Sequence, residues 1–510
     1  MPFSSTASAR QNEDFCLLAH LRPHAFFKAL SRGETIIWLL TLSLFLHLFL
    51  AAVVPLTADE AYAVVVSRSH ALSYYDHPPL AFAMARVMAD LTGHETPFIT
   101  RLPFVLMGTG SAILLFDITR RLYGAQAARW ATAAFCLSPF FFSFAQGLIM
   151  PDGPLDFFLL LSFWLIQPVL FMNRESLLSW PAAGMALALA MMSKYQAVLF
   201  AVAALLALIL TPQGRRQFKR PGLWIGLGLA FLGALPVIIW NAHHGWASFA
   251  FQTGRAYHHT SLIGHLGNGL AVLAGQALYL MPVTWLACQR QIVLALKSPK
   301  MEPAFLLAVL AIVPIVVFDV IALTGRHSLP HWTMSGFLFA LPLVGRVRAR
   351  MSGQGRFLRL KLAGCVVGAA GLVLAAQAQF DLTALLPKPL HRTDLGWQNL
   401  PWRALDGQVP GADRFIVTPD WVSAGQAGLA LGPDYPLRVL SDAHQFQFMD
   451  QGRLKTMRDG YYVQAVPVGG RADMSALQQT YRLDGPARIL PQFHVGHAAF
   501  DLVIAPVSLK

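Results

Sequence analysis

Long apolar stretches recur along most of this chain, and they limit its fold more than any other feature. Stretches of roughly 17–25 residues are each long enough for a helix to cross the ~30 Å hydrocarbon core of a bilayer. Of the 510 residues, 55% are hydrophobic and only 13% are charged, unlike a typical soluble domain. We count about eleven such stretches, near residues 36–56, 102–119, 127–148, 154–172, 178–193, 196–211, 222–241, 264–287, 303–323, 332–345 and 362–380. The sequence therefore predicts a polytopic α-helical membrane protein.

The loops between these stretches alternate in charge. Basic residues gather in every second loop, at Arg120-Arg121, at Arg174, at Arg215-Arg216 with Lys219-Arg220, and in the ranges 290–300 and 346–361. Cytoplasmic loops of membrane proteins are enriched in Lys and Arg, so eleven spans place all of these loops on the cytoplasmic side. If 178–193 and 196–211 formed one helix, these basic loops would fall on both faces of the membrane. The N-terminus is predicted inside and the region after residue 381 outside.

The chain changes character near residue 381. Only 14 of the 26 Asp and Glu residues precede this point, while 12 follow it, together with short β-like runs at 414–417, 437–440 and 460–463. About 130 residues are enough for one small α/β domain. We therefore predict a cytoplasmic segment at 1–34, a membrane domain at 35–380 with its first outer loop at 57–101, and a mixed α/β periplasmic domain at 381–510.

The net charge of +13 comes largely from the predicted cytoplasmic loops, which indicates contact with anionic lipid headgroups rather than with nucleic acid. The sequence contains no P-loop and no dinucleotide fingerprint, so no nucleotide cofactor is expected. Any energy source must therefore come with the substrate.

Polar residues from five separate segments fall on the predicted outer face. An acidic pair, Asp59-Glu60, stands at the outer end of the first apolar stretch, where an unpaired charge costs several kcal/mol and so indicates function. The other candidates are Tyr62, Tyr75, Asp76 and His77 in the first outer loop, Asp152 in the second, Lys194 and Tyr195 in the third, Arg255 in the fourth, and His331 and Trp332 in the fifth.

This mixture suits transfer of a group from a phosphate-linked donor. Carboxylates can act as bases or bind a hard cation, cationic side chains can stabilise phosphate charge, and aromatic rings can stack on sugar faces. Some of these residues have a purely structural explanation as well. The acidic pair fits a solvated helix end and Lys194 fits a snorkelling side chain, while Asp152 fits a turn and Trp332 fits an interfacial aromatic belt.

Four motifs in register with this topology resemble the GT-C membrane glycosyltransferases of the family 39/83 group. They are Asp59-Glu60, the 75–80 run Tyr-Asp-His-Pro-Pro-Leu, the 150–154 run Met-Pro-Asp-Gly-Pro, and Ser193-Lys194-Tyr195; a Leu-Pro-His-Trp turn at 329–332 looks like bacterial members. The group includes protein mannosyltransferases and the aminoarabinose transferase that modifies lipid A. The likeness covers about residues 35–345.

The resemblance implies a large first outer loop with two juxtamembrane helices, and it implies roles for single residues. Asp59 would be the base, with Glu60 beside it and Asp152 as the acid of the second outer turn. Lys194, helped by His77 or Arg255, would hold the donor phosphate, and Tyr62, Tyr75, Asp76, Tyr195, His331 and Trp332 would contact sugar or acceptor. At His77 the aminoarabinose transferase has lysine instead, which leaves the role of His77 open.

The expected activity is inverting transfer of a sugar from a polyprenyl-phosphate donor to a hydroxyl of a periplasmic acceptor, such as lipid A, core oligosaccharide, another envelope glycan or protein. The enzyme would lie in the bacterial inner membrane. A divalent cation (Mg²⁺, Mn²⁺ or Zn²⁺) held by Asp59 and His77 is a further expectation.

Three other functions are compatible with parts of the sequence. A lipid-linked sugar flippase would explain the helices, but predicts inverted repeats and charges near the bilayer midplane, neither of which is evident. An O-antigen ligase or polymerase would place its long outer loop late in the chain, and here the long loop comes first. A membrane scaffold that displays residues 381–510 would leave the ordered acidic motifs unexplained.

Overall fold

The structure is a computed structural model, and it describes residues 34–510 apart from positions 173, 175, 257–260, 325–327, 351–369, 372–399, 411–412, 442 and 495. The chain divides into two compact units. Unit 1 comprises residues 1–45, 104–147 and 151–366, and unit 2 comprises residues 46–103, 148–150 and 367–510. Two long helices, α3 (Glu34–Val53) and α6 (Pro97–Tyr123), contribute residues to both units.

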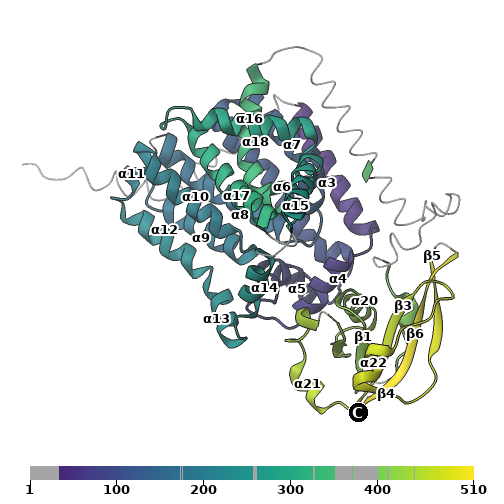
Figure 1. The fold of residues 1–510 in the computed structure, drawn as a ribbon. Helices are drawn as coiled ribbons and strands as arrows, with labels where there is room; N and C mark the ends of the chain where they lie inside the picture. The colour runs from purple at the N-terminus through teal and green to yellow at the C-terminus, as the bar shows by residue number, and fades with distance from the viewer. Residues whose placement is uncertain are drawn as a thin grey trace, which may run out of the picture. The chain divides into compact units, whose positions relative to one another are not determined.

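Unit 1 is a helical bundle, labelled along its length in Figure 1. Its remaining helices are α7 (Ala125–Leu137), the π-helical turn η1 (Phe141–Ala145), α8 (Asp152–Phe171), α9 (Ser179–Ser193), α10 (Ala197–Leu210), α11 (Pro212–Gln217), α12 (Pro221–Leu232), α13 (Leu235–His243), α14 (Ala247–Ala256), α15 (Leu262–Leu280), α16 (Pro282–Leu296), α17 (Pro303–Thr324), the 3₁₀ turn η2 (Pro330–Thr333) and α18 (Met334–Arg350).

Five helices of the described chain are long and apolar enough to cross a membrane. They are Ile36–Val53, Pro97–Tyr123, Asp152–Phe171, Pro221–His243 and Pro303–Thr324. The pair α15 and α16, bent by 106°, adds a sixth if it counts as one broken span. This confirms a multi-pass helical membrane protein. The count of eleven spans stays a prediction, since the stretch at 362–380 falls almost wholly outside the described residues.

The break between the predicted stretches 178–193 and 196–211 is present in the structure. Helix α9 ends at Ser193, Lys194 has extended backbone angles (φ −154°, ψ 140°), and α10 begins at Ala197. Helix α9 also packs closely on α12, where a Cβ added to Gly184 would collide with the backbone of Gly226. Glycine at position 184 is therefore required by the close approach of the two helices.

Unit 2 combines the first outer loop with the C-terminal region. Its elements are α4 (Ala58–Ser67), α5 (Leu80–Thr92), η6 (Arg403–Leu405), β1 (Phe415–Thr418), α20 (Trp421–Leu431), β2 (Leu437–Val439), η7 (Ala443–Gln445), α21 (Gln451–Thr456), β3 (Asp459–Val466), α22 (Ser475–Thr480), β4 (Tyr481–Leu483), β5 (Arg488–His494) and β6 (His497–Leu509). The two helices α4 and α5 are the pair that the resemblance implies for the first outer loop.

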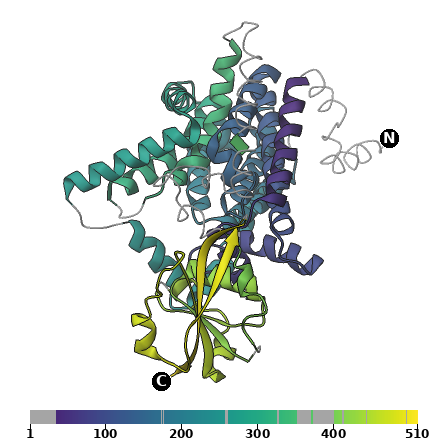
Figure 2. The ribbon, with the colours of Figure 1, turned by 90° about the vertical axis from the view of Figure 1, so that its right-hand side faces the viewer.

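The sheet of unit 2 has both parallel and antiparallel pairs, and together with its helices it forms the predicted α/β region. Its order is β2-β1-β3-β6-β4, with β5 also paired to β6; β2, β1 and β3 run parallel, and β3, β4 and β5 run antiparallel to β6. Figure 2 shows the long C-terminal strands as yellow arrows. The three predicted β runs form β1, β2 and β3, because apolar side chains such as Phe415, Val417 and Tyr462 bury in one core.

Helix α20 packs directly against α4. A Cβ added to Gly425 of α20 would lie 2.9 Å from the backbone nitrogen of Tyr62, so glycine there permits the contact. The first outer loop and the C-terminal region are thus far apart in sequence but pack against each other within unit 2. The predicted boundary at 381 stays a prediction, since residues 372–399 are outside the described part.

Candidate active site

The acidic pair lies in the first turn of α4, which corrects its predicted place at the end of the first apolar helix. Helix α3 ends at Val53, and Thr57 caps α4 with a capping box: its hydroxyl accepts a hydrogen bond from Glu60 N, and Glu60 accepts one from Thr57 N. The reason is local, because a Thr-x-x-Glu run favours a new helix start. Asp59 and Glu60 consequently point in different directions from one rigid turn.

Glu60 is fully buried and its oxygens are occupied. The guanidinium of Arg101 donates to it from Nε at 2.7 Å and from Nη2 at 2.6 Å, and the backbone nitrogens of Thr57 and Ile149 donate at 2.9 and 3.0 Å. Burial by itself raises the pKa of Glu60, but Arg101 and these N–H groups outweigh it and lower the pKa below its usual value. Glu60 is therefore an ionised anchor rather than a group with a free lone pair for chemistry.

Arg101 is a site residue that the sequence did not single out. It is 2% exposed, and besides Glu60 it donates to the carbonyl oxygens of Val54 at 2.6 Å and Pro55 at 2.8 Å. It therefore ties the start of α6 to the segment that precedes α4. The available signal was a lone arginine near the start of a long apolar helix, where a charge requires a partner.

Asp59 has the opposite environment. Its side chain reaches solvent, yet protein atoms crowd around the carboxyl group. This partial burial raises the pKa of Asp59, and the negative charges of Asp76 and Glu60 raise it further. A solvent-accessible carboxylate with a raised pKa has the properties of a general base.

Tyr62 and Asp76 form the second polar contact of this region. The Tyr62 hydroxyl donates to Asp76 Oδ1 at 2.9 Å, and burial, followed by the charge of Asp76, raises the pKa of Tyr62 well above its usual value. The Tyr62 ring is buried edge-on against Phe82, Trp421 and Phe446. Tyr62 is 4% exposed, and its predicted contact with sugar or acceptor stays a prediction.

Tyr75 and His77 are half-buried in the same unit. Tyr75 stacks on His444 of the C-terminal region, with ring centroids 5.2 Å apart, and the His77 carbonyl accepts from the backbone nitrogen of Tyr74 at 3.0 Å. Among the residues that the structure describes, no group of three or more His, Cys, Asp or Glu side chains is arranged to hold a metal ion. The predicted metal site has two protein ligands, Asp59 and His77, and it stays a prediction.

In unit 1, the structure brings together two residues to which the sequence assigns different roles. Lys194 Nζ lies 2.7 Å from Asp152 Oδ1, and both side chains are buried. Asp152 stands in the first turn of α8, where a negative charge suits the helix dipole, and Lys194 reaches it from the break between α9 and α10. Asp156, one turn further along α8, is also fully buried, with Asp152, Lys194 and Ser335 as its polar neighbours.

The remaining candidates of unit 1 each contact an aromatic ring. The Arg255 guanidinium lies 4.9 Å from the ring centroid of Trp332, and the His331 ring stacks with Phe144 at 5.8 Å. Tyr195 contacts Phe249 edge-on at 6.0 Å. Arg255 is thus held by a cation–π contact with one face of the Trp332 indole.

Six of the twelve predicted site residues therefore lie in unit 2 and six in unit 1. Unit 2 holds Asp59, Glu60, Tyr62, Tyr75, Asp76 and His77, and unit 1 holds Asp152, Lys194, Tyr195, Arg255, His331 and Trp332. Both units hold carboxylates among these candidates, and Asp59 and Asp152 differ: Asp59 reaches solvent, whereas Asp152 is buried in an ion pair.

Comparison with known proteins identifies the fold. Residues 76–240 match the sequence profile of the dolichyl-phosphate-mannose-protein mannosyltransferase family. The chain is 26% identical over 336 residues to the lipid A galacturonosyltransferase RgtD of Rhizobium johnstonii, across 64% of this chain and 67% of that protein. Its structure resembles that of ArnT from Cupriavidus metallidurans bound to undecaprenyl phosphate, with a TM-score of 0.62 at 15% identity, over 92% of this chain and 97% of ArnT.

The apo structure of the same ArnT gives a TM-score of 0.58 at 14% identity, over 93% of this chain and 98% of ArnT. The likeness to ArnT thus extends over nearly the whole length of this protein. The chain therefore has the fold of a GT-C membrane protein, and the family match and the sequence likeness both support a membrane glycosyltransferase.

Proposed function

We propose that this enzyme transfers one sugar from a polyprenyl-phosphate carrier to a hydroxyl group of lipid A or a related envelope glycan, on the periplasmic side of the bacterial inner membrane. The observation that carries the proposal is the fold likeness to ArnT bound to undecaprenyl phosphate over almost the whole chain. The sequence likeness to a lipid A galacturonosyltransferase supports the acceptor class.

Asp59 is the proposed base. Its carboxylate would take the proton of the acceptor hydroxyl while that oxygen forms a bond to the anomeric carbon of the donor sugar. The bond from the anomeric carbon to the phosphate oxygen breaks at the same time, and its electron pair leaves with the polyprenyl phosphate. Attack from the face opposite the phosphate inverts the anomeric configuration.

The other residues of unit 2 would position this base. Glu60, held by Arg101 and the backbone, fixes the first turn of α4 and so the direction of Asp59. Asp76 raises the pKa of Asp59 by its charge, and Tyr62 holds Asp76 in place through its hydroxyl. Lys194 and His77 are the proposed ligands of the departing phosphate, where a preorganised donor can contribute roughly 3–4 kcal/mol.

The test is sugar transfer in membranes that contain the full chain. Radiolabelled polyprenyl-phosphate sugars would be supplied as donors, native envelope lipid as acceptor, and membranes without the protein as control. Label that moves to the acceptor lipid supports the proposal. Label that crosses the bilayer while still on its carrier, with no transfer from any donor, would instead indicate a flippase.

The rate of transfer should fall at acidic pH, and the midpoint of this fall should lie above the ordinary range of an aspartate. A base works only when ionised, and burial, Asp76 and Glu60 all raise the pKa of Asp59. Asp76→Asn removes one of these charges and should move the midpoint to lower pH. Asp90→Asn, which removes an exposed charge of α5 outside the proposed machinery, serves as the control. An equal midpoint in the wild type and in Asp76→Asn would argue against Asp59 as the titrating base.

A transfer rate that stays within about twofold after exhaustive chelation would exclude the predicted cation at Asp59 and His77. The measurement is transfer after treatment with a chelator, with Mg²⁺, Mn²⁺ and Zn²⁺ added back separately. Loss of activity that one of these ions restores would establish a metal requirement and support the predicted cation at Asp59 and His77.

A further inference from the structure

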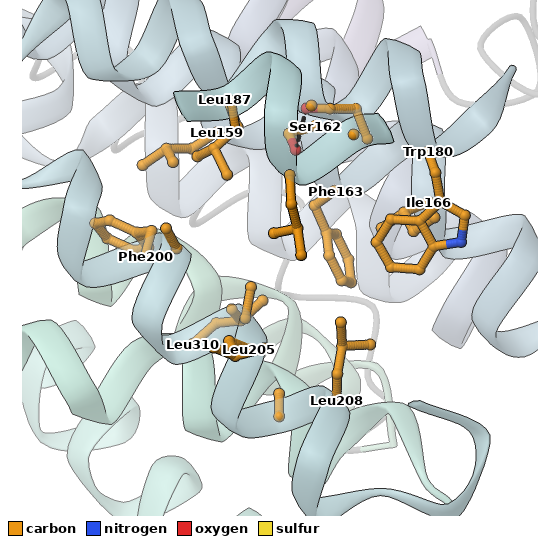
Figure 3. Close-up of a pocket in the computed structure, with 18 of the residues that line it drawn as sticks. Leu159, Ser162, Phe163, Ile166, Trp180, Leu187, Phe200, Leu205, Leu208 and Leu310 are labelled. Atoms are coloured by element: carbon orange, nitrogen blue, oxygen red, sulfur yellow. Dashed lines mark hydrogen bonds between the residues drawn. The ribbon is translucent and has the colours of Figure 1, made fainter. Parts of the chain in front are cut away.

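An apolar pocket of about 120 Å³ lies in unit 1, toward the end of the bundle away from Asp152 and Lys194. Helices α8, α9, α10, α12 and α17 enclose it, and Figure 3 shows Leu159, Phe163, Phe200, Leu205, Leu208 and Leu310 around it. On α8 the lining runs from Leu159 to Leu170, which lies roughly 27 Å beyond Asp152 along an ideal helix. None of the residues proposed for sugar transfer lines this pocket.

The lining offers no polar group to a ligand. Of the residues around the pocket, Ser162 and Trp180 alone carry polar side-chain atoms, and both are satisfied within the protein: Ser162 Oγ donates to Ala183 O at 2.9 Å and Trp180 Nε1 to Gln217 Oε1 at 3.2 Å. Apolar cavities of this kind stay dry and take apolar ligands. The chemistry therefore selects a hydrocarbon chain.

The pocket opens at the side of the bundle. Two residues that line it, Leu205 on α10 and Leu227 on α12, are 39% and 36% exposed. Helix α12 belongs to a candidate membrane span, and α10 is a shorter apolar helix. A chain of a surrounding lipid could therefore enter sideways without crossing a polar surface.

Three basic residues lie at one end of this pocket. The lining residue Leu208 leads directly into α11, whose Arg215 and Arg216 are exposed, and exposed Lys219 follows before the lining residue Leu223. The hydrogen bond from Trp180 to Gln217 ties α11 to the pocket wall. Clusters of Lys and Arg at the membrane surface attract anionic lipid headgroups.

We propose that this pocket is a binding site for an anionic phospholipid, with one acyl chain among α8, α9, α10 and α12 and its phosphate over Arg215, Arg216 and Lys219. The charge pattern of the loops predicts that this end faces the cytoplasm, so the occupant is a lipid of the cytoplasmic leaflet. The proposal is independent of the sugar-transfer reaction, and its test uses lipid binding rather than activity.

The test is native mass spectrometry of the full chain in detergent, equilibrated separately with phosphatidylglycerol, phosphatidylcholine and undecaprenyl phosphate. The wild type should retain one phosphatidylglycerol molecule in preference to phosphatidylcholine. Ala201→Phe with Ala204→Phe fills the pocket and should lower this retention about tenfold or more. Val202→Phe adds a ring on the same helix at a position that is 51% exposed and outside the lining, and should leave retention unchanged.

A second set of variants tests the headgroup without changing the pocket. Arg215→Gln, Arg216→Gln and Lys219→Gln together should lower phosphatidylglycerol retention about tenfold, and Arg290→Gln, an exposed cation of α16, should not. These surface changes keep the proposal testable even if the paired phenylalanines prevent folding. The proposal is overturned if the wild type retains no phospholipid, if undecaprenyl phosphate displaces phosphatidylglycerol and is itself lost on filling the pocket, or if both sets of variants bind like the wild type.

Discussion

Replacing Asp59 by asparagine is expected to lower the rate of sugar transfer by about 10²- to 10⁴-fold. Asparagine has nearly the same shape but cannot accept the proton of the acceptor hydroxyl. The change should not destabilise the fold, because it removes a negative charge that lies near the charges of Asp76 and Glu60. The measurements are the initial rate of transfer in membranes at matched protein levels and the unfolding temperature of the purified protein.

Asp90→Asn provides the matched control for this prediction. Asp90 is an exposed aspartate of α5 in the same unit, where it pairs with Arg86 at 2.7 Å and lies outside the proposed machinery. Its substitution should change the rate by less than about twofold, since exposed ion pairs contribute little. An Asp59→Asn enzyme that transfers sugar at the wild-type rate would refute the assignment of the base.

Lys194→Ala is expected to destabilise the folded protein by about 3–5 kcal/mol. The substitution leaves the Asp152 carboxylate buried in the helical bundle without the cation that now lies 2.7 Å from it. The loss should appear as a lower unfolding temperature in detergent. Lys194→Met combined with Asp152→Asn should recover most of the stability, because no unpaired charge is then buried.

The same variants separate a structural role of Lys194 from a role in phosphate binding. If Lys194 also holds the departing phosphate, the double variant will be stable but will transfer sugar more slowly than Asp152→Asn alone. Glu302→Gln is the control for stability: Glu302 pairs with Arg346 at 3.3 Å, both side chains are substantially exposed, and the loss should stay below about 1 kcal/mol. An unchanged unfolding temperature for Lys194→Ala would show that its pair with Asp152 does not support the fold.

Much of the architecture was predictable because it depends on short-range patterns. The apolar stretches mark membrane helices by length alone, and the runs at 414–417, 437–440 and 460–463 mark strands β1, β2 and β3. The break at Lys194 followed from the alternation of loop charges. The order of the four motifs was enough to indicate the GT-C type, because motif order is a property of the sequence itself.

The contacts of the site residues were not predictable in the same way. Glu60 belongs to an acidic pair in the sequence, but in the fold Arg101, 41 positions away, and the backbone of Ile149 make it an anchor. The sequence did not indicate that the Tyr62 ring contacts Trp421 and Phe446 of the C-terminal region. Lys194 was expected to face a phosphate, and it already holds Asp152.

These differences share one physical cause. A helix or strand follows from residues a few positions apart, so its sequence carries its own evidence. Which residue contacts a buried charge or ring depends on which helices pack together. The sequence alone does not reveal that packing. Asp59 and Glu60 illustrate the point: they are adjacent in sequence and chemically alike, yet tertiary contacts leave one open to solvent with a raised pKa and lock the other as a buried ion.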